Sequence, residues 1–300
     1  MFSKGAGNVL YKIDSDRLLR VRMNKEEGCI DSEQAYDGIV RQILPNLNPL
    51  EFVEVDEKKL KELDPDNTYG LSNIGQVTEN LIKDYELVVE IKPKWASRPN
   101  PLTAGERESR MKLKNGFESE RLFSGNSQDQ IEEIAKLMDT DSKFITVFSK
   151  GEKVKVDSET VAPQVQKALQ DSGVMATIKH YQLYCDPLDL QYIYPRIKDL
   201  NTDNASSREL QEAVSKIPKQ GGDEATWQQL KDFGESLRST ELLYLYSLAM
   251  TLRDVSIFVR LSSSVEVKVV DADYKSLSRI HKWYASDCKL NNFHDPGTNR

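Results

Sequence analysis

The first ninety residues alternate apolar and polar positions in short runs, with one helical pattern between them. Residues 8–13 and 18–22 are predicted strands, and the polar turn between them predicts an antiparallel hairpin. Residues 33–44 carry their apolar side chains on one helical face, and Pro45 ends that helix. Residues 87–91 are apolar apart from one glutamate, which predicts a buried strand.

The pattern of the remaining chain is mostly helical. Residues 127–138 form an apolar helical stripe with Ser127 as the expected N-cap, and residues 144–148 form a strand. Two late strands, at 255–261 and 265–270, are separated by a serine-rich turn. The other predicted helices are at residues 158–169, 187–200, 206–217, 223–237, 240–252 and from about 274 to about 287. A β-rich front, a helical back and a late hairpin predict a two-lobed α+β protein.

Composition and charge narrow the class of protein. The chain has 300 residues, of which 38% are hydrophobic and 30% charged, as in ordinary folded proteins. The net charge of −7 argues against a protein that coats nucleic acid or anionic membrane. No apolar run is long enough to span a bilayer, and the N-terminus becomes charged too early for a signal peptide. The scattered cysteines favour a reducing compartment, and we expect a location in the nucleus or cytoplasm. We also expect a monomer.

Two segments near the N-terminus could meet phosphate groups. Gly5 and Gly7 precede Asn8, and a pair of glycines lets backbone N–H groups approach a phosphate closely. The alternative is a plain N-terminal turn. Arg20 and Arg22 lie on one face of the second strand, where kinase-type sites place a cation that holds nucleotide phosphates. A strand face exposed to solvent is the alternative there.

The segment EIKPK at residues 90–94 is the most unusual part of the chain. Alternation places Glu90, Lys92 and Lys94 on one face at the end of a buried strand. Charges in that position are costly unless they face a wet pocket, and Pro93 stiffens the segment before Lys94. The alternative is a strand that simply emerges into solvent.

Two acids flank the late hairpin. Asp254 starts its first strand and Asp271 ends its second, so both carboxylates lie at the mouths of neighbouring strands. Such a pair can bridge one Mg²⁺ ion and position an acceptor hydroxyl, and Asp273 is a nearby competitor for the second place. Surface acids that cap a hairpin are the alternative.

Basic side chains are concentrated in two groups, although the whole chain is acidic. Residues 92–121 contain eight Lys and Arg, among them Lys112 and Lys114, against four acids, which suits an anion-binding funnel or a solvated loop. The second group lies on one side of the predicted final helix and consists of Lys275, Arg279, Lys282 and Trp283. It faces either bulk water or a cleft. A basic pocket within an acidic exterior requires both groups to face the same cleft.

Taken in order, these pieces resemble the inositol-pentakisphosphate 2-kinase family. The specific element is EIKPK, the family's hallmark, joined by the terminal pattern D-x₃-K-x₃-R-x₃-aromatic at residues 271–283. Supporting elements follow in the expected order: GAGNVL, LLRVR, LFSG with a helix and FITVF after it, and the RDVS turn. The resemblance spans residues 2 to about 290, and the compact size is similar to that of fungal members.

The resemblance implies a protein-kinase-like N-lobe at residues 1–94 that binds nucleotide and ends with EIKPK. It also implies an enlarged, largely helical C-lobe at residues 95–300 that binds inositol phosphate and metal. The implied reaction is ATP- and Mg²⁺-dependent phosphorylation of the 2-hydroxyl of inositol 1,3,4,5,6-pentakisphosphate, which gives inositol hexakisphosphate (phytate). A kinase of a less phosphorylated inositol and a non-catalytic sensor of inositol hexakisphosphate are the alternatives.

The resemblance also assigns roles to single residues. Asp254 would meet the acceptor hydroxyl and the metal, Asp271 would be the second Mg²⁺ ligand, and Lys92 would lie near the transferred phosphate. The expected contacts of the substrate phosphates are Lys94, Lys112, Lys114, Lys275, Arg279 and Trp283. The expected nucleotide contacts are Gly5, Gly7, Asn8, Arg20 and Arg22. Trp283 stands where the family often has tyrosine, and Lys112 and Lys114 occupy the place of a family segment, MHQ-x-x-K, that is not recognisable here.

Overall fold

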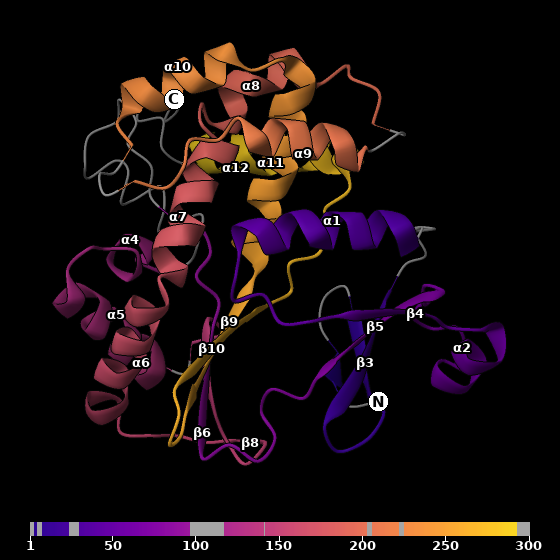
Figure 1. Ribbon diagram of the computed structural model, residues 1–300, viewed down its shortest axis with the longest axis vertical. Coiled ribbons are helices and arrows are strands. Elements are labelled where there is room, and N and C mark those ends of the chain that lie inside the picture. Colours follow the sequence, from indigo (N-terminus) through magenta and orange to yellow (C-terminus); the bar gives the residue numbers. More distant parts are fainter. Residues whose placement is uncertain are drawn as a thin grey trace.

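The computed structural model describes residues 3–4, 8–23, 30–96, 117–140, 142–202, 206–221 and 225–292. In this part of the chain the strands form two antiparallel sheets of five strands each. The sheets occupy one end of the molecule, and most helices of the second half gather at the other end (Figure 1). The prediction of a mixed α+β protein is confirmed at this level.

The first sheet is built from the N-terminal strands in the order β1-β2-β3-β5-β4. Its strands are β1 (Ser3–Lys4), β2 (Asn8–Lys12), β3 (Arg17–Arg22), β4 (Glu51–Glu54) and β5 (Ile74–Glu79). The predicted hairpin of β2 and β3 is present, and Asp14 closes its turn by accepting the backbone N–H groups of Asp16 and Arg17. We did not predict β4, β5 or the short helix α2 (Glu57–Leu63), whose only apolar side chains, Leu60 and Leu63, are too few to make a clear stripe.

The second sheet joins strands from distant parts of the chain in the order β10-β9-β6-β7-β8. Its strands are β6 (Leu87–Ile91), β7 (Ile145–Ser149), β8 (Glu152–Lys153), β9 (Ser256–Leu261) and β10 (Glu266–Val270). The central place of β6 explains why Val88, Val89 and Ile91 are fully buried. β6 pairs with later strands and not with the first sheet. The lobe boundary expected at residue 94 remains a prediction.

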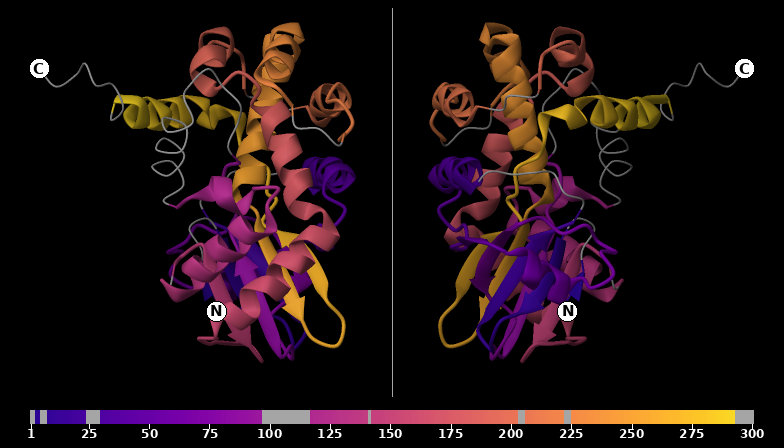
Figure 2. Two further views of the ribbon diagram at one scale, coloured as in Figure 1. Left: turned by 90° about the vertical axis from the view of Figure 1, so that its left-hand side faces the viewer. Right: turned by 90° about the vertical axis from the view of Figure 1, so that its right-hand side faces the viewer.

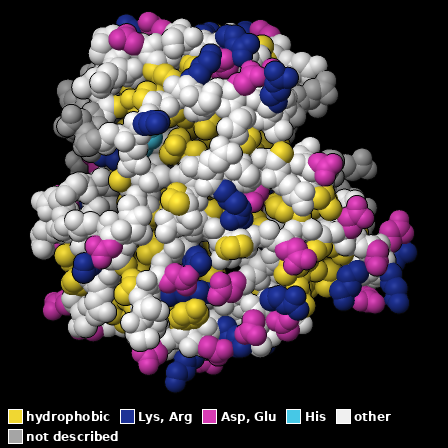
Figure 3. Space-filling model, in the orientation of Figure 1, with side chains coloured by type: hydrophobic (Ala, Val, Ile, Leu, Met, Phe, Trp, Pro, Cys, Tyr) yellow, Lys and Arg dark blue, Asp and Glu magenta, His cyan; other side chains and the backbone are white. Residues whose placement is uncertain are grey.

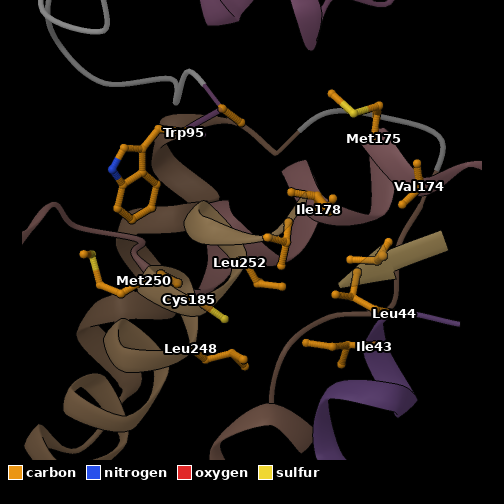
Figure 4. Close-up of a cluster of buried hydrophobic side chains, with 14 of the residues drawn as sticks. Ile43, Leu44, Trp95, Val174, Met175, Ile178, Cys185, Leu248, Met250 and Leu252 are labelled. Atoms are coloured by element: carbon orange, nitrogen blue, oxygen red, sulfur yellow. The ribbon is translucent and has the colours of Figure 1, made fainter. Parts of the chain in front are cut away.

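Helix α1 (Ile30–Ile43) lies between the first sheet and the helical layer (Figure 1). The chain after it is fastened to the second sheet, because Asn48 N–H donates to Val269 O at 2.8 Å and Val269 N–H donates to Asn46 O at 2.8 Å. Figure 4 shows Ile43 and Leu44 near Leu248, Leu252 and Ile178, which come from helices of the second half, in the main core. The core therefore connects the N-terminal helix to the helices of the second half.

Most of the remaining helices follow the apolar stripes, with differences at their ends. They are α4 (Ser119–Leu122), α5 (Ser127–Asp139), α6 (Ser158–Ser172), α7 (Val174–Cys185), α8 (Leu190–Ile197), α9 (Ser207–Ser215), α10 (Trp227–Ser236), α11 (Ser239–Asp254), the 3₁₀ turn η1 (Leu277–Arg279) and α12 (Ile280–Asn292). The N-cap of α5 is Asn126, not Ser127, because its side chain accepts the N–H of Gln128 at 2.9 Å. Within the described residues, no helix is long and apolar enough to cross a membrane.

Helix α7 is the largest element that we failed to predict. It follows α6 directly through Gly173, whose positive φ of 66° permits the sharp change of direction. Val174, Ile178 and Cys185 share a buried face with the polar Gln182, while Leu183 and Tyr184 are buried off that face, so the apolar helical period is weak. α7 packs along α11 in the interior of the helical half, as the side views in Figure 2 also show.

The last helix begins later than predicted, at Ile280 and not near residue 274. Residues 271–276 are irregular because α11 holds two of their carbonyl groups. Thr251 Oγ1 donates to Asp273 O at 2.7 Å, and Ser247 Oγ donates to Lys275 O at 2.5 Å. These carbonyls therefore bind side chains in place of the N–H groups of a following helical turn, and the segment lies along α11.

Candidate active site

The ends of three strands meet at one edge of the second sheet and carry most of the predicted site. Ile91 of β6 lies opposite Ile257 of β9, so the segment EIKPK leaves its strand beside the start of β9. Val270 of β10 lies opposite Ser256, which brings Asp271 to the same place. The fold thus joins the family's three separate motifs, EIKPK, RDVS and the terminal pattern, at one sheet edge.

Asp254 is the last residue of α11. The expectation that it starts a strand is therefore wrong. A carboxylate is unfavourable there, because the C-terminal end of a helix carries partial negative charge. Two lysines compensate: Lys94 Nζ lies 3.5 Å from Asp254 Oδ1, and Lys275 Nζ lies 3.2 Å from Oδ2. One lysine from each predicted basic group therefore meets the same carboxylate, as a shared cleft requires.

The positive charges around Asp254 keep its carboxylate ionised. Burial by itself would raise the pKa of Asp254, but the charges of Lys275, Arg253 and Lys94 lower that pKa below its ordinary value. Burial also lowers the pKa of Lys94, against the opposing effect of Asp254. At neutral pH the site therefore offers an anionic oxygen that can accept a hydrogen bond from a hydroxyl or bind a metal ion.

The backbone that carries Lys94 is held in an unusual conformation. Lys94 has a φ of +60°, in the left-handed region that favours glycine. Gln182 of α7, which is 2% exposed, fixes this segment. Its Nε2 donates to Lys94 O at 2.7 Å and to Leu252 O at 3.2 Å, and its Oε1 accepts the N–H of Ala96 at 2.7 Å. Sequence reasoning missed Gln182 because the helix that carries it was not predicted.

Lys92 and Asp271 lie next to a polar pair, the partly buried Glu90 and the fully buried Ser256. Lys92 Nζ is 3.5 Å from Glu90 Oε1, and Ser256 Oγ donates to that same oxygen at 3.0 Å. Ser256 Oγ is also 3.4 Å from Asp271 Oδ2. The side chains of Lys92 and Asp271 are 39% and 42% exposed, so both remain accessible to a ligand.

Two of the residues predicted to hold nucleotide phosphates converge on one carboxylate, Asp273. The guanidinium of Arg20 donates through both Nη atoms to the two oxygens of Asp273. Arg20 Nη2 also lies 3.0 Å from Asp271 Oδ1, and Asn8 Nδ2 donates to Asp273 Oδ2 at 3.4 Å. Burial opposes the charge on Arg20, but Asp273 and Asp271 together raise its pKa above the ordinary value.

Arg22, the third predicted nucleotide contact in the described part, faces a different acid. Its two Nη atoms donate to Glu33 Oε1 and Oε2 of α1 at 2.7 and 3.0 Å, and it lies 3.9 Å from Asp273. Gly5 and Gly7 lie outside the described residues, so their predicted contact with phosphate has no structural counterpart here.

The other residues predicted to contact substrate phosphates do not lie on one face of a single helix. Lys275 lies in the irregular segment, Arg279 in η1 and Trp283 in α12, so the basic strip that we predicted on a single helix is wrong. Arg279 is exposed, and the Trp283 ring lies 5.8 Å from that of Tyr246. Lys112 and Lys114 lie outside the described residues.

The donor groups suit a magnesium ion that arrives with a phosphate substrate. In the ranges that the structure describes, no group of three or more His, Cys, Asp or Glu is arranged to hold a metal ion. Mg²⁺ in kinases is typically held by one or two carboxylates, with substrate phosphates and water completing its shell. Asp254 and Asp271, both partly exposed at one sheet edge, meet that smaller requirement.

Comparison with known proteins gives one family. The family model described as inositol-pentakisphosphate 2-kinase matches residues 2–289. No curated protein matches the chain. The matched residues include both sheets and the sheet edge at which EIKPK, Asp254 and Asp271 meet.

Proposed function

Because the chain belongs to the inositol-pentakisphosphate 2-kinase family and is an inositol phosphate kinase, we propose its specific reaction. It transfers the γ-phosphate of ATP to the 2-hydroxyl of inositol 1,3,4,5,6-pentakisphosphate and forms inositol hexakisphosphate. The observation that carries this proposal is Asp254, held between Lys94 and Lys275 at 3.5 and 3.2 Å. A carboxylate surrounded by cations suits an acceptor that is itself a polyanion.

Phosphoryl transfer depends on positioning and charge neutralisation more than on covalent chemistry. In our proposal the acceptor hydroxyl donates to the Asp254 carboxylate, which orients its oxygen toward the γ-phosphate. Lys94 and Lys275 exchange part of their contact with Asp254 for phosphate oxygens of the incoming substrate. Lys92, two residues before Lys94 on the same segment, contacts the transferred phosphate.

Mg²⁺ would be held by Asp254 and Asp271, and it would neutralise charge on the phosphates during transfer. The nucleotide would lie on the side of the first sheet, near Asn8, Arg20 and Arg22. The remaining predicted contacts with substrate phosphates are Lys112, Lys114, Arg279 and Trp283. A monomer in the nucleus or cytoplasm, without nucleic acid or membrane partners, remains our expectation.

A comparison of substrates tests the proposal directly. Purified protein is given ATP, Mg²⁺ and, in separate reactions, inositol phosphates that carry from three to five phosphates. We expect the highest kcat/KM for the pentakisphosphate with a free 2-hydroxyl. Preference for a less phosphorylated inositol would replace the proposed substrate. Tight Mg²⁺-independent binding of inositol hexakisphosphate without ATP consumption would instead identify a sensor.

A further inference from the structure

Asp273 has no part in the proposed reaction, yet it gathers more polar contacts than either proposed metal ligand. Its side chain is 12% exposed and accepts hydrogen bonds from both Nη atoms of Arg20 and from the side-chain amide of Asn8. Its backbone carbonyl is held by Thr251 of α11, whose hydroxyl in turn accepts from Tyr36 of α1 at 2.6 Å. Asp273 is therefore a fixed anion between the first sheet and the segment that carries Asp271.

Arg20 is fixed just as firmly from its own side. It is 8% exposed, and its Nη1 donates to Gln76 Oε1 of β5 at 2.6 Å. With two anchors in place, its Nη2 reaches Asp271 Oδ1 at 3.0 Å. The planar guanidinium fork allows one side chain to bridge both acids, which a lysine could not do.

The bridge makes Arg20 and a metal ion rivals for Asp271. A cation on Asp271 repels the guanidinium beside it, and the guanidinium lowers the affinity of Asp271 for a second cation. We propose that Asp273 is a positioning residue that holds Arg20 against Asp271, so that Mg²⁺ and Arg20 compete for that carboxylate. When the metal takes Asp271, the part of the Arg20 charge that Asp271 had balanced becomes available to nucleotide phosphates. The inference rests on the proposed function, because it takes Asp271 as a metal ligand.

This arrangement links nucleotide binding to the metal ion. Before metal binds, the charge of Arg20 is balanced by two acids, and little of its field is left for phosphates. After metal binds, Asp273 and Gln76 keep Arg20 in place while its contact with Asp271 is lost. The protein would therefore hold nucleotide phosphates better together with Mg²⁺ than without it.

A double-mutant cycle on Mn²⁺ binding tests the inference. Mn²⁺ serves as the probe for Mg²⁺, and free Mn²⁺ is measured by electron paramagnetic resonance with the protein alone. Arg20→Gln should tighten Mn²⁺ binding about fivefold, since a competing cation is removed. Asp273→Asn should also tighten it about fivefold in the wild-type background, because Arg20 is then no longer held against Asp271. In the Arg20→Gln background the same change should have less than about a twofold effect.

The cycle separates positioning from simple charge. If Asp273 acted only through its own negative charge, Asp273→Asn would weaken Mn²⁺ binding equally in both backgrounds, and the inference would be wrong. It would also be wrong if neither single variant changed the affinity, or if the wild-type protein bound no Mn²⁺. The matched control is Asp64→Asn, a buried acid that accepts the N–H groups of Thr68 and Tyr69. It should lower the Tm and leave Mn²⁺ affinity unchanged.

Folding and function are checked separately. Circular dichroism establishes whether each variant is folded. If Arg20→Gln does not fold, Arg20→Lys replaces it, because lysine keeps the charge but cannot bridge both acids. The effect of Asp273→Asn should shrink in the Arg20→Lys background as well. Wild-type turnover is measured in parallel: its absence would reject the proposed function, while the Mn²⁺ cycle would still decide the inference.

Discussion

At the scale of single residues, the site is a balance of opposite charges that sequence spacing only partly reveals. EIKPK, Asp254 and Asp271 could be singled out as candidates, because each lies at or close to the end of a strand whose pattern is clear. Asp273 could be named only as a competitor for the metal, and Gln182 not at all, because their partners, Arg20 and the carbonyl of Lys94, are distant in the sequence. Residues whose role depends on a long-range contact leave no local pattern.

Asp254→Asn tests the central carboxylate. We expect kcat to fall by about 10³-fold, since the amide cannot orient or accept the hydroxyl proton as the carboxylate does. Nucleotide affinity measured without Mg²⁺ should stay within about twofold, because the proposed nucleotide contacts lie elsewhere. Steady-state kinetics and isothermal titration calorimetry measure the two quantities. The control is Asp37→Asn, which removes an acid paired with Arg41 on α1. Turnover close to wild type in Asp254→Asn would refute the assigned role.

Lys275→Met tests the proposed contact with substrate phosphate. Losing one charge-assisted contact should raise KM for the pentakisphosphate about tenfold and KM for ATP less than twofold. Lys167→Met, on the exposed face of α6 and paired with Asp171, is the matched control and should change neither. If KM for ATP rose more than KM for the inositol phosphate, Lys275 would belong to the nucleotide site.

At the scale of elements, amphipathic helices and the β2–β3 hairpin could be predicted, whereas β4, β5 and α7 could not. The helices α1, α5 and α6 each bury a stripe with helical spacing, which is visible in the sequence. In α7 the buried face includes the polar Gln182, and Leu183 and Tyr184 are buried off that face, so its pattern is not clearly amphipathic. The late start of α12 follows from tertiary hydrogen bonds from α11, which local propensity cannot report.

Gln182→Leu tests whether α7 supports the EIKPK segment. Its side chain satisfies three backbone groups, at Lys94, Ala96 and Leu252, in the interior. Leaving them without partners should lower the free energy of unfolding by about 2 kcal/mol and reduce kcat as Lys94 shifts. Urea denaturation and kinetics measure both. Gln164→Leu, on the exposed side of α6, is the control, and a stability loss below about 0.5 kcal/mol for Gln182→Leu would contradict this support.

At the scale of the whole molecule, the net charge of −7 describes the exterior more than the site. Acidic and basic side chains are interspersed on the face drawn in Figure 3, while Lys94 and Lys275 meet at Asp254. The negative total therefore does not conflict with a polyanionic substrate. The composition correctly indicated an ordinary folded protein, but it could not predict how the cations are arranged.

The stability of the whole protein is expected to depend on pH through Glu241. Glu241 joins α11 to the loop after α9, with Lys216 Nζ at 2.8 Å and Arg238 Nη2 at 2.6 Å from its Oε1. Burial would raise the pKa of Glu241, but these partners lower it to about 2. Between about pH 5 and pH 2 the unfolded chain binds the proton more readily than the folded protein, so stability falls as the pH falls.

Since the two cationic partners are half exposed and screened, we expect this loss to be about 2 kcal/mol. Urea denaturation at a series of pH values measures it in wild type and in Glu241→Gln. The variant should lack this contribution and be less stable at pH 7 by a similar amount. An equally steep acid dependence in the variant would show that other carboxylates are responsible.

The identity of the product tests the central claim most directly. The pentakisphosphate is incubated with ATP, Mg²⁺ and the protein, and the product is analysed by phosphorus NMR, with Asp254→Asn in parallel. We predict one new phosphate resonance, from the 2-position of inositol hexakisphosphate, in the wild-type reaction and none with the variant. A phosphate on any other oxygen, or no ATP-dependent product with the wild-type protein, would contradict the account.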